Sequence, residues 1–158
     1  MGDVILKENN YINEYETSYD NQKLIIATVR NHNKLEIERN LDDKTELFCK
    51  IVRDADKVDI LLTQSLYEIS DNYNISDNIY KSFKNHEMVK NKDVLSEDDE
   101  ILRQVAFIFD LEFKESFKML KQSNILCKIF NYIKSNSNSK YIEEIEKIVF
   151  EYIEKHIY

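Results

Sequence analysis

The chain has 158 residues and a formal net charge of −8, with 42% hydrophobic residues, 33% charged residues, one glycine and no proline. This composition is typical of a globular domain with a core and excludes a disordered chain. The acidic balance argues against nucleic acid as a partner, because phosphate backbones are bound by clustered lysine and arginine. The only glycine, Gly2, excludes glycine-rich phosphate loops.

Apolar residues recur at helical spacing, and nearly glycine-free, proline-free chains form helices more easily than sheets. We therefore predict an all-α fold, a single domain of about seven or eight helices. The predicted helical segments are 20–33, 43–70, 77–86, 97–109, 113–121, 123–134 and 141–156, and residues 1–16 are expected to form a short helix or two half-turns. Asp20 and Ser76 are expected to cap two of them, and Ser96 with Asp99 resembles a capping box. Turns with positive φ are expected to use Asn or Asp.

The longest predicted helix, 43–70, carries charges inside an apolar run. A stripe predicted to face the core consists of Ile51, Ala55, Val58, Leu62 and Leu66. Asp56 and Asp59 lie at one edge of this stripe and Asp54 lies at the other. Carboxylates at the edge of a buried stripe are partly desolvated, which is costly unless cations or donors meet them. Two interpretations remain open, a binding site or a solvated network in which Lys50, Arg53 and Lys57 neutralise the acids.

His32 is the most informative of the three histidines, because it lies between Asn31 and Asn33 where a predicted helix ends. A neutral imidazole is a good ligand for transition metals and titrates near neutral pH. The alternative is that His32 interacts with the helix terminus and its dipole.

The two cysteines, Cys49 and Cys127, lack the spacing of a zinc site. No apolar run reaches the length of a membrane span, and the N-terminus has no signal-peptide pattern. We therefore expect no membrane partner and a cytoplasmic location.

Three segments, in chain order, resemble HD-domain metal-dependent phosphohydrolases. Residues 51–59, IVRDADKVD, are similar to the family motif that supplies the last metal-binding aspartate from a long helix. Residues 25–34, IIATVRNHNK, resemble the segment that precedes this helix in one bacterial subgroup. Residues 105–113, VAFIFDLEF, resemble a downstream segment of the same subgroup.

The resemblance implies an all-α HD-like fold, a divalent metal (Mn, Mg, Fe or Zn) and a small phosphorylated substrate, such as a nucleotide. It also implies hydrolysis of a phosphoester or phosphoanhydride by a metal-activated water. By position, Asp56 matches the metal-binding aspartate, and His32 matches a histidine near the metal or the substrate phosphate. The resemblance implies catalytic or orienting roles for His32, Arg53 and Asp59, and supporting roles for Asp54 and Lys57.

The defining early histidine and His-Asp pair of the family have no counterpart here, since no His-Asp dipeptide occurs and no histidine precedes His32. Residues 1–15 resemble the stretch that follows this pair. We therefore expect a truncated HD-like domain over 1–158, in which 1–70 retain part of the HD core and 71–158 form a C-terminal helical extension.

Such a chain is expected to have little or no hydrolase activity and too few ligands to hold a metal tightly. The surface left by the missing helices would be covered by a protein partner or a homo-oligomer. The alternative function is that of a non-catalytic helical interaction or nucleotide-binding module derived from an HD domain.

Overall fold

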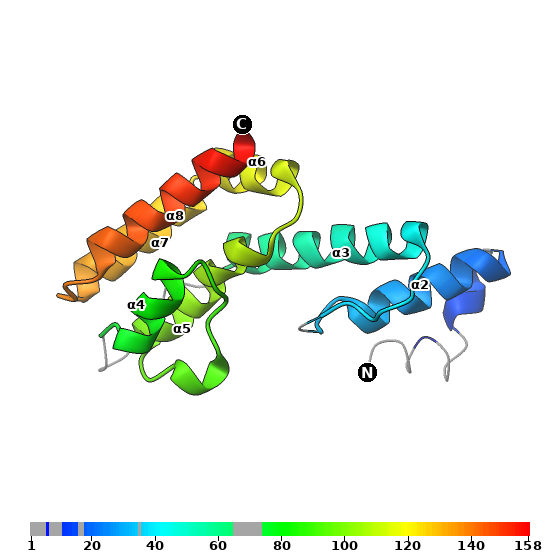
Figure 1. Ribbon diagram of the computed structural model, residues 1–158, viewed down its shortest axis with the longest axis horizontal. Helices are drawn as coiled ribbons and strands as arrows, with labels where there is room; N and C mark the ends of the chain where they lie inside the picture. The colour runs from blue at the N-terminus through cyan, green and yellow to red at the C-terminus, as the bar shows by residue number, and fades with distance from the viewer. Residues whose placement is uncertain (1–5, 7–10, 16–17, 35, 65–73) are drawn as a thin grey trace. The chain divides into compact units, whose positions relative to one another are not determined.

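The computed structural model describes residues 6, 11–15, 18–34, 36–64 and 74–158. These residues form α-helices and short 3₁₀ helices and no strand, which confirms the predicted all-α fold (Figure 1). The α-helices are α2 (Tyr19–Asn31), α3 (Asp43–Leu62), α4 (Asp77–Lys84), α5 (Glu97–Val105), α6 (Lys114–Ser123), α7 (Ile125–Asn136) and α8 (Ile142–Ile157). The 3₁₀ helices are η1 (Tyr11–Tyr15), η2 (Asn91–Asp93) and η3 (Ala106–Asp110).

The chain divides into two compact units, Met1–Asp56 and Lys57–Tyr158, and the boundary between them falls inside α3. The described part of the first unit holds η1, α2 and most of α3. The second unit begins with the last turns of α3 and holds all later helices. The prediction of one domain with a subdivision after residue 70 stays a prediction.

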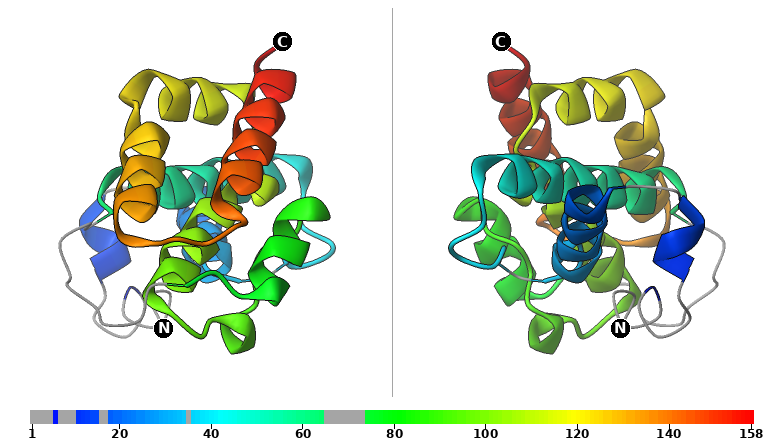
Figure 2. Two further views of the ribbon diagram at one scale, coloured as in Figure 1. Left: turned by 90° about the vertical axis from the view of Figure 1, so that its left-hand side faces the viewer. Right: turned by 90° about the vertical axis from the view of Figure 1, so that its right-hand side faces the viewer.

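The core of the second unit is built from the apolar faces of its helices. On α8, Ile145, Val149 and Ile153 recur every fourth residue and are buried, and α8 packs along α4, α6 and α7 (Figure 2). Ile79 and Phe83 of α4, four residues apart on one face of the helix, are also fully buried. Because the apolar residues at helical spacing are the ones that pack into this core, their spacing was sufficient to predict the helices within residues 77–156.

Helix starts are set by nearby side chains. Ser96 caps α5 by accepting from the Asp99 N–H at 3.1 Å, as predicted. The prediction for α2 was wrong, because the helix begins one residue before Asp20 and Ser18 accepts from the Asn21 N–H at 3.4 Å. Asp42 accepts from the Thr45 N–H at 3.0 Å at the start of α3.

Among the described residues, positive φ occurs at Asn40, His86 and Asn124. The two asparagines agree with the expectation that Asn replaces glycine in such turns. His86 was not expected there; its ring lies against the rings of Phe109 and Tyr152, at centroid distances of 5.4 and 5.1 Å.

The predicted core-facing stripe of α3 was largely wrong. Val58 is 4% exposed, but Ile51 and Leu62 are 44% and 39% exposed, Ala55 is also exposed, and Leu66 lies outside the described residues. The buried residues of α3 are Thr45, Cys49, Arg53, Asp54, Lys57, Val58 and Leu61. The buried residues include the cations Arg53 and Lys57, and each donates to a carbonyl oxygen that is distant in the sequence. No helix in the described ranges is long and apolar enough to cross a membrane.

Candidate functional site

The end of α2 is fixed by the buried side-chain amide of Asn31. Its Nδ2 donates to the Ala27 carbonyl at 2.8 Å, and its Oδ1 accepts from the Glu38 N–H at 2.9 Å. One side chain thus joins the last turn of α2 to the backbone seven residues later. The turn between them carries His32.

His32 is half-buried, and its Nδ1 lies 2.7 Å from the Val29 carbonyl oxygen. A carbonyl oxygen only accepts hydrogen bonds, so the proton of the neutral ring belongs on Nδ1. The lone pair of Nε2 is then free to accept a hydrogen bond or to bind a cation. This arrangement agrees with the site role expected for His32 and equally with a role at the helix terminus.

Arg53 ties α3 to the turn that follows α2. Its guanidinium is buried, and Nη1 donates to the Lys34 carbonyl and, at 3.5 Å, to the Asn31 carbonyl. Both acceptors belong to the segment that carries His32. Arg53 is therefore a positioning residue for this turn, and its predicted catalytic role stays a prediction.

Lys57 makes the corresponding connection inside the second unit. Its ammonium lies 2.6 Å from Asp110 Oδ2 and donates to the Asp110 carbonyl at 3.3 Å. Asp110 is the aspartate of η3, within the segment 105–113. Arg53 and Lys57 are one helical turn apart on α3, and their side chains contact segments 25–34 and 105–113, respectively.

The three aspartates in the second half of α3 have different surroundings. Asp54 is buried, Asp56 is half-buried and Asp59 is exposed. The expected metal ligands, Asp56 and His32, supply two donors, whereas a catalytic metal centre usually has at least three protein ligands. No group of three or more His, Cys, Asp or Glu that could hold a metal ion exists within the described ranges. These residues alone do not fit a complete divalent-metal centre.

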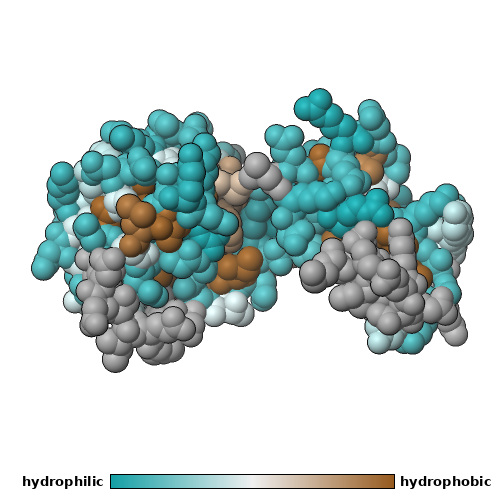
Figure 3. Space-filling model, turned by 90° about the horizontal axis from the view of Figure 1, so that it is seen from below, coloured by the Kyte–Doolittle hydropathy of each residue, from teal (hydrophilic) through white to brown (hydrophobic). Residues whose placement is uncertain are grey.

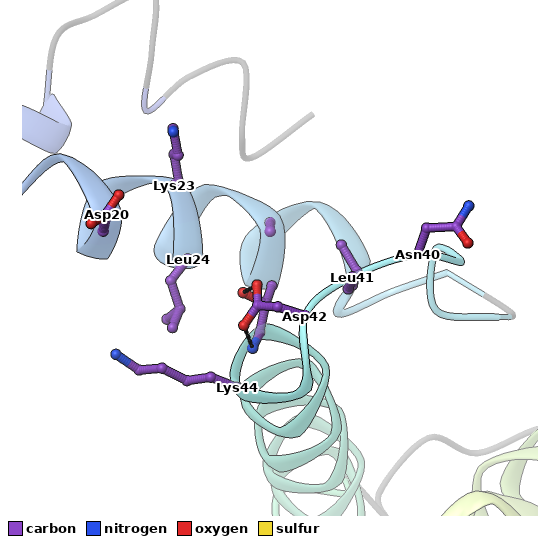
Figure 4. Close-up of a pocket in the computed structure, with 9 residues that line it drawn as sticks. Asp20, Lys23, Leu24, Asn40, Leu41, Asp42 and Lys44 are labelled. Atoms are coloured by element: carbon purple, nitrogen blue, oxygen red, sulfur yellow. Dashed lines mark hydrogen bonds between the residues drawn. The ribbon is translucent and has the colours of Figure 1, made fainter.

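A cavity of about 430 Å³ lies in the first unit beside α2 and the start of α3. Its lining includes two acids and two lysines, Asp20, Asp42, Lys23 and Lys44. Figure 4 shows Lys23 and Leu24 leaving α2 on opposite sides. Asp42 accepts hydrogen bonds from the N–H and the hydroxyl of Thr45. The charges balance and Asp42 is already engaged, so the cavity shows no preference for an anion or a cation. The sequence analysis did not identify this cavity.

Comparison with protein-family models found no match, and searches among characterised proteins and solved structures found no significant similarity.

Proposed function

We propose that the chain carries the aspartate-bearing part of an HD-type, metal-dependent phosphohydrolase that acts on a nucleotide or another phosphoester. The observation that carries this proposal is the pair of contacts made by α3. Arg53 bonds to the backbone of the segment that contains His32, and Lys57 bonds to Asp110. Three segments that resemble one family are thus linked through neighbouring residues of one helix.

The proposal assigns Asp56 as a metal ligand, the Nε2 of His32 as a metal ligand or phosphate contact, and Asp59 as a supporting group. Two donors are too few for a hydrolytic metal centre, so no hydrolytic step is assigned to these residues. We therefore expect the 158-residue chain alone to lack phosphohydrolase activity.

Hydrolysis is tested with the purified chain, a panel of nucleoside phosphates and a generic phosphoester, in Mn²⁺ and in Mg²⁺. The expected result is phosphate release equal to that of Asp56→Ala. Robust turnover that disappears in Asp56→Ala but persists in Asp43→Ala, an exposed acid at the start of the same helix, would contradict the incomplete site.

The family assignment has a separate test that does not depend on activity. Millimolar Mn²⁺ broadens nuclear magnetic resonance signals near the ion, and we expect the His32 ring and the Asp56 backbone to broaden first. Asp56→Ala is expected to remove the effect at His32. Even broadening over all exposed acids would contradict the proposal that these two residues share a site.

An alternative function, a non-catalytic interaction module, is favoured by the exposed apolar face of α3. Leu47, Ile51 and Ala55 recur every fourth residue on this face with Phe48 beside them, and all four are exposed. Elsewhere, on the side seen in Figure 3, hydrophilic residues predominate and hydrophobic ones form separate patches. An apolar stripe on a helix is a typical docking surface, and under this alternative a second copy of the chain covers it.

Self-association through this stripe predicts that the wild type sediments with a mass above the 19.0 kDa of one chain. Ile51→Glu is expected to sediment as a monomer with unchanged helical circular dichroism, because burying a carboxylate in the interface between two copies is costly. Met119→Glu, at another exposed apolar residue, is the control and should sediment like the wild type. A wild type that stays monomeric at high concentration would exclude the homo-oligomer.

A further inference from the structure

Two adjacent acids in the first turn of α5, Asp98 and Asp99, are both 0% exposed but have opposite surroundings. Asp99 accepts from the Ser76 N–H at 2.9 Å, from the Leu95 N–H at 3.0 Å and from the Ser76 hydroxyl. These bonds hold the start of α4 against the start of α5. Both carboxylate oxygens of Asp99 therefore accept hydrogen bonds.

Asp98 has no such partners. Within the described ranges, neither of its carboxyl oxygens has a hydrogen bond, and the same is true of the buried hydroxyl of Ser137. These two groups nevertheless interact with each other, although their geometry falls short of a hydrogen bond. A buried polar group without a partner destabilises the fold, and more so when the group is charged. A proton on Asp98 removes this cost, because a neutral carboxyl has an O–H that can donate to the hydroxyl.

The electrostatic surroundings of Asp98 favour the proton. Burial raises the pKa of Asp98 most, the Ser137 hydroxyl lowers it by a smaller amount, and the negative charges of Asp99 and Glu97 raise it further. Among the described residues of α4, η3 and α7, which pack against α5, no cation acts on this carboxyl.

Ser137 lies where α7 ends and the short linker to α8 begins. Its N–H donates to the Ile133 carbonyl at 2.8 Å, and α8 starts at Ile142. Beyond the linker, Glu144 of α8 accepts from the Tyr80 hydroxyl at 2.6 Å. The position of this linker therefore affects how α8 meets α4.

We propose that Asp98 and Ser137 form a proton-dependent clamp within the second unit. The neutral Asp98 carboxyl donates its hydrogen to the Ser137 hydroxyl and holds linker 137–141 against the start of α5. When Asp98 loses its proton to solvent, the charged carboxylate becomes hydrated and linker 137–141 separates from α5.

The pH dependence follows from proton linkage. The pKa of Asp98 in the folded chain lies above its ordinary value of 3.8, so the folded chain retains a proton that the unfolded chain releases. The stabilisation by Asp98 is complete below pH 3.8 and is lost as the pH rises through the raised pKa. Each unit by which this pKa is raised changes the opening equilibrium about tenfold.

The test is amide hydrogen exchange of linker 137–141 between about pH 3.5 and about pH 8, corrected for the intrinsic rate. In the wild type, the protection factor is expected to fall with pH, by about tenfold per unit of raised pKa. Asp98→Asn should keep its protection constant, because the amide does not ionise. The control, Glu97→Gln, alters the partly exposed neighbour and should retain the pH dependence of the wild type.

A second measurement does not rely on the folding of a variant. The ¹³C shift of the Asp98 carboxyl in the wild type is expected to titrate above the ordinary value of 3.8. Titration at or below that value would overturn the clamp. A parallel loss of linker protection in the wild type and in Asp98→Asn would overturn it as well.

Discussion

Replacement of Asp99 by alanine is expected to lower the free energy of unfolding of the second unit by about 3–5 kcal/mol. The carboxylate accepts three hydrogen bonds from Ser76 and Leu95. Alanine leaves these partly buried donors without an acceptor, which costs more than the bonds themselves contribute. Urea unfolding with peptide-resolved hydrogen exchange measures the change, and protection should fall first where α4 and α5 begin.

Asp93→Ala is the matched control, because this neighbouring acid accepts an exposed bond from Asn78 Nδ2 at 3.3 Å. Its effect should stay within about 0.5 kcal/mol. Equal urea midpoints for Asp99→Ala and Asp93→Ala would show that the α4–α5 junction does not depend on Asp99.

Local features of the fold were predictable from the sequence because they depend on a few neighbouring residues. The Ser96 cap and the buried faces of α4 and α8 need only a spacing of three or four residues. The two asparagines with positive φ follow from the near absence of glycine. In each case the interacting groups lie within one or two helical turns.

Long-range pairings were not predictable by the same rules. The Ser96–Asp99 motif predicted a reciprocal capping box, but the Asp99 carboxylate bonds to Ser76, 23 residues earlier. The buried face of α3 was misassigned for the same reason. Periodicity assigns Arg53 and Lys57 to the solvent-exposed side of α3. Both are instead buried, and they donate to backbone carbonyls 19 and 53 residues away, respectively. The candidate site depends on these contacts, so its residues could be named from the resemblance but not placed.

Replacement of Arg53 by alanine is expected to destabilise the first unit by about 2–4 kcal/mol. The substitution removes a buried charged donor and leaves the carbonyls of Asn31 and Lys34 without it. Hydrogen exchange should show lost protection from the end of α2 to the Glu38 amide, which bonds to Asn31. Peptides of residues 74–158 should exchange as in the wild type if the two units respond separately.

The same variant separates a positioning role from a purely structural one. When the turn is released, the His32 ring is expected to lose its bond to the Val29 carbonyl, and its ¹⁵N shifts should move toward those of an exposed imidazole. Arg53→Lys keeps the charge but lacks the guanidinium whose Nη1 donates to both carbonyls, so we expect an intermediate shift. Arg39→Ala removes an exposed arginine of the same unit and should leave both readouts unchanged. Unchanged His32 shifts in a destabilised Arg53→Ala would mean that Arg53 supports α3 without setting the geometry of the turn.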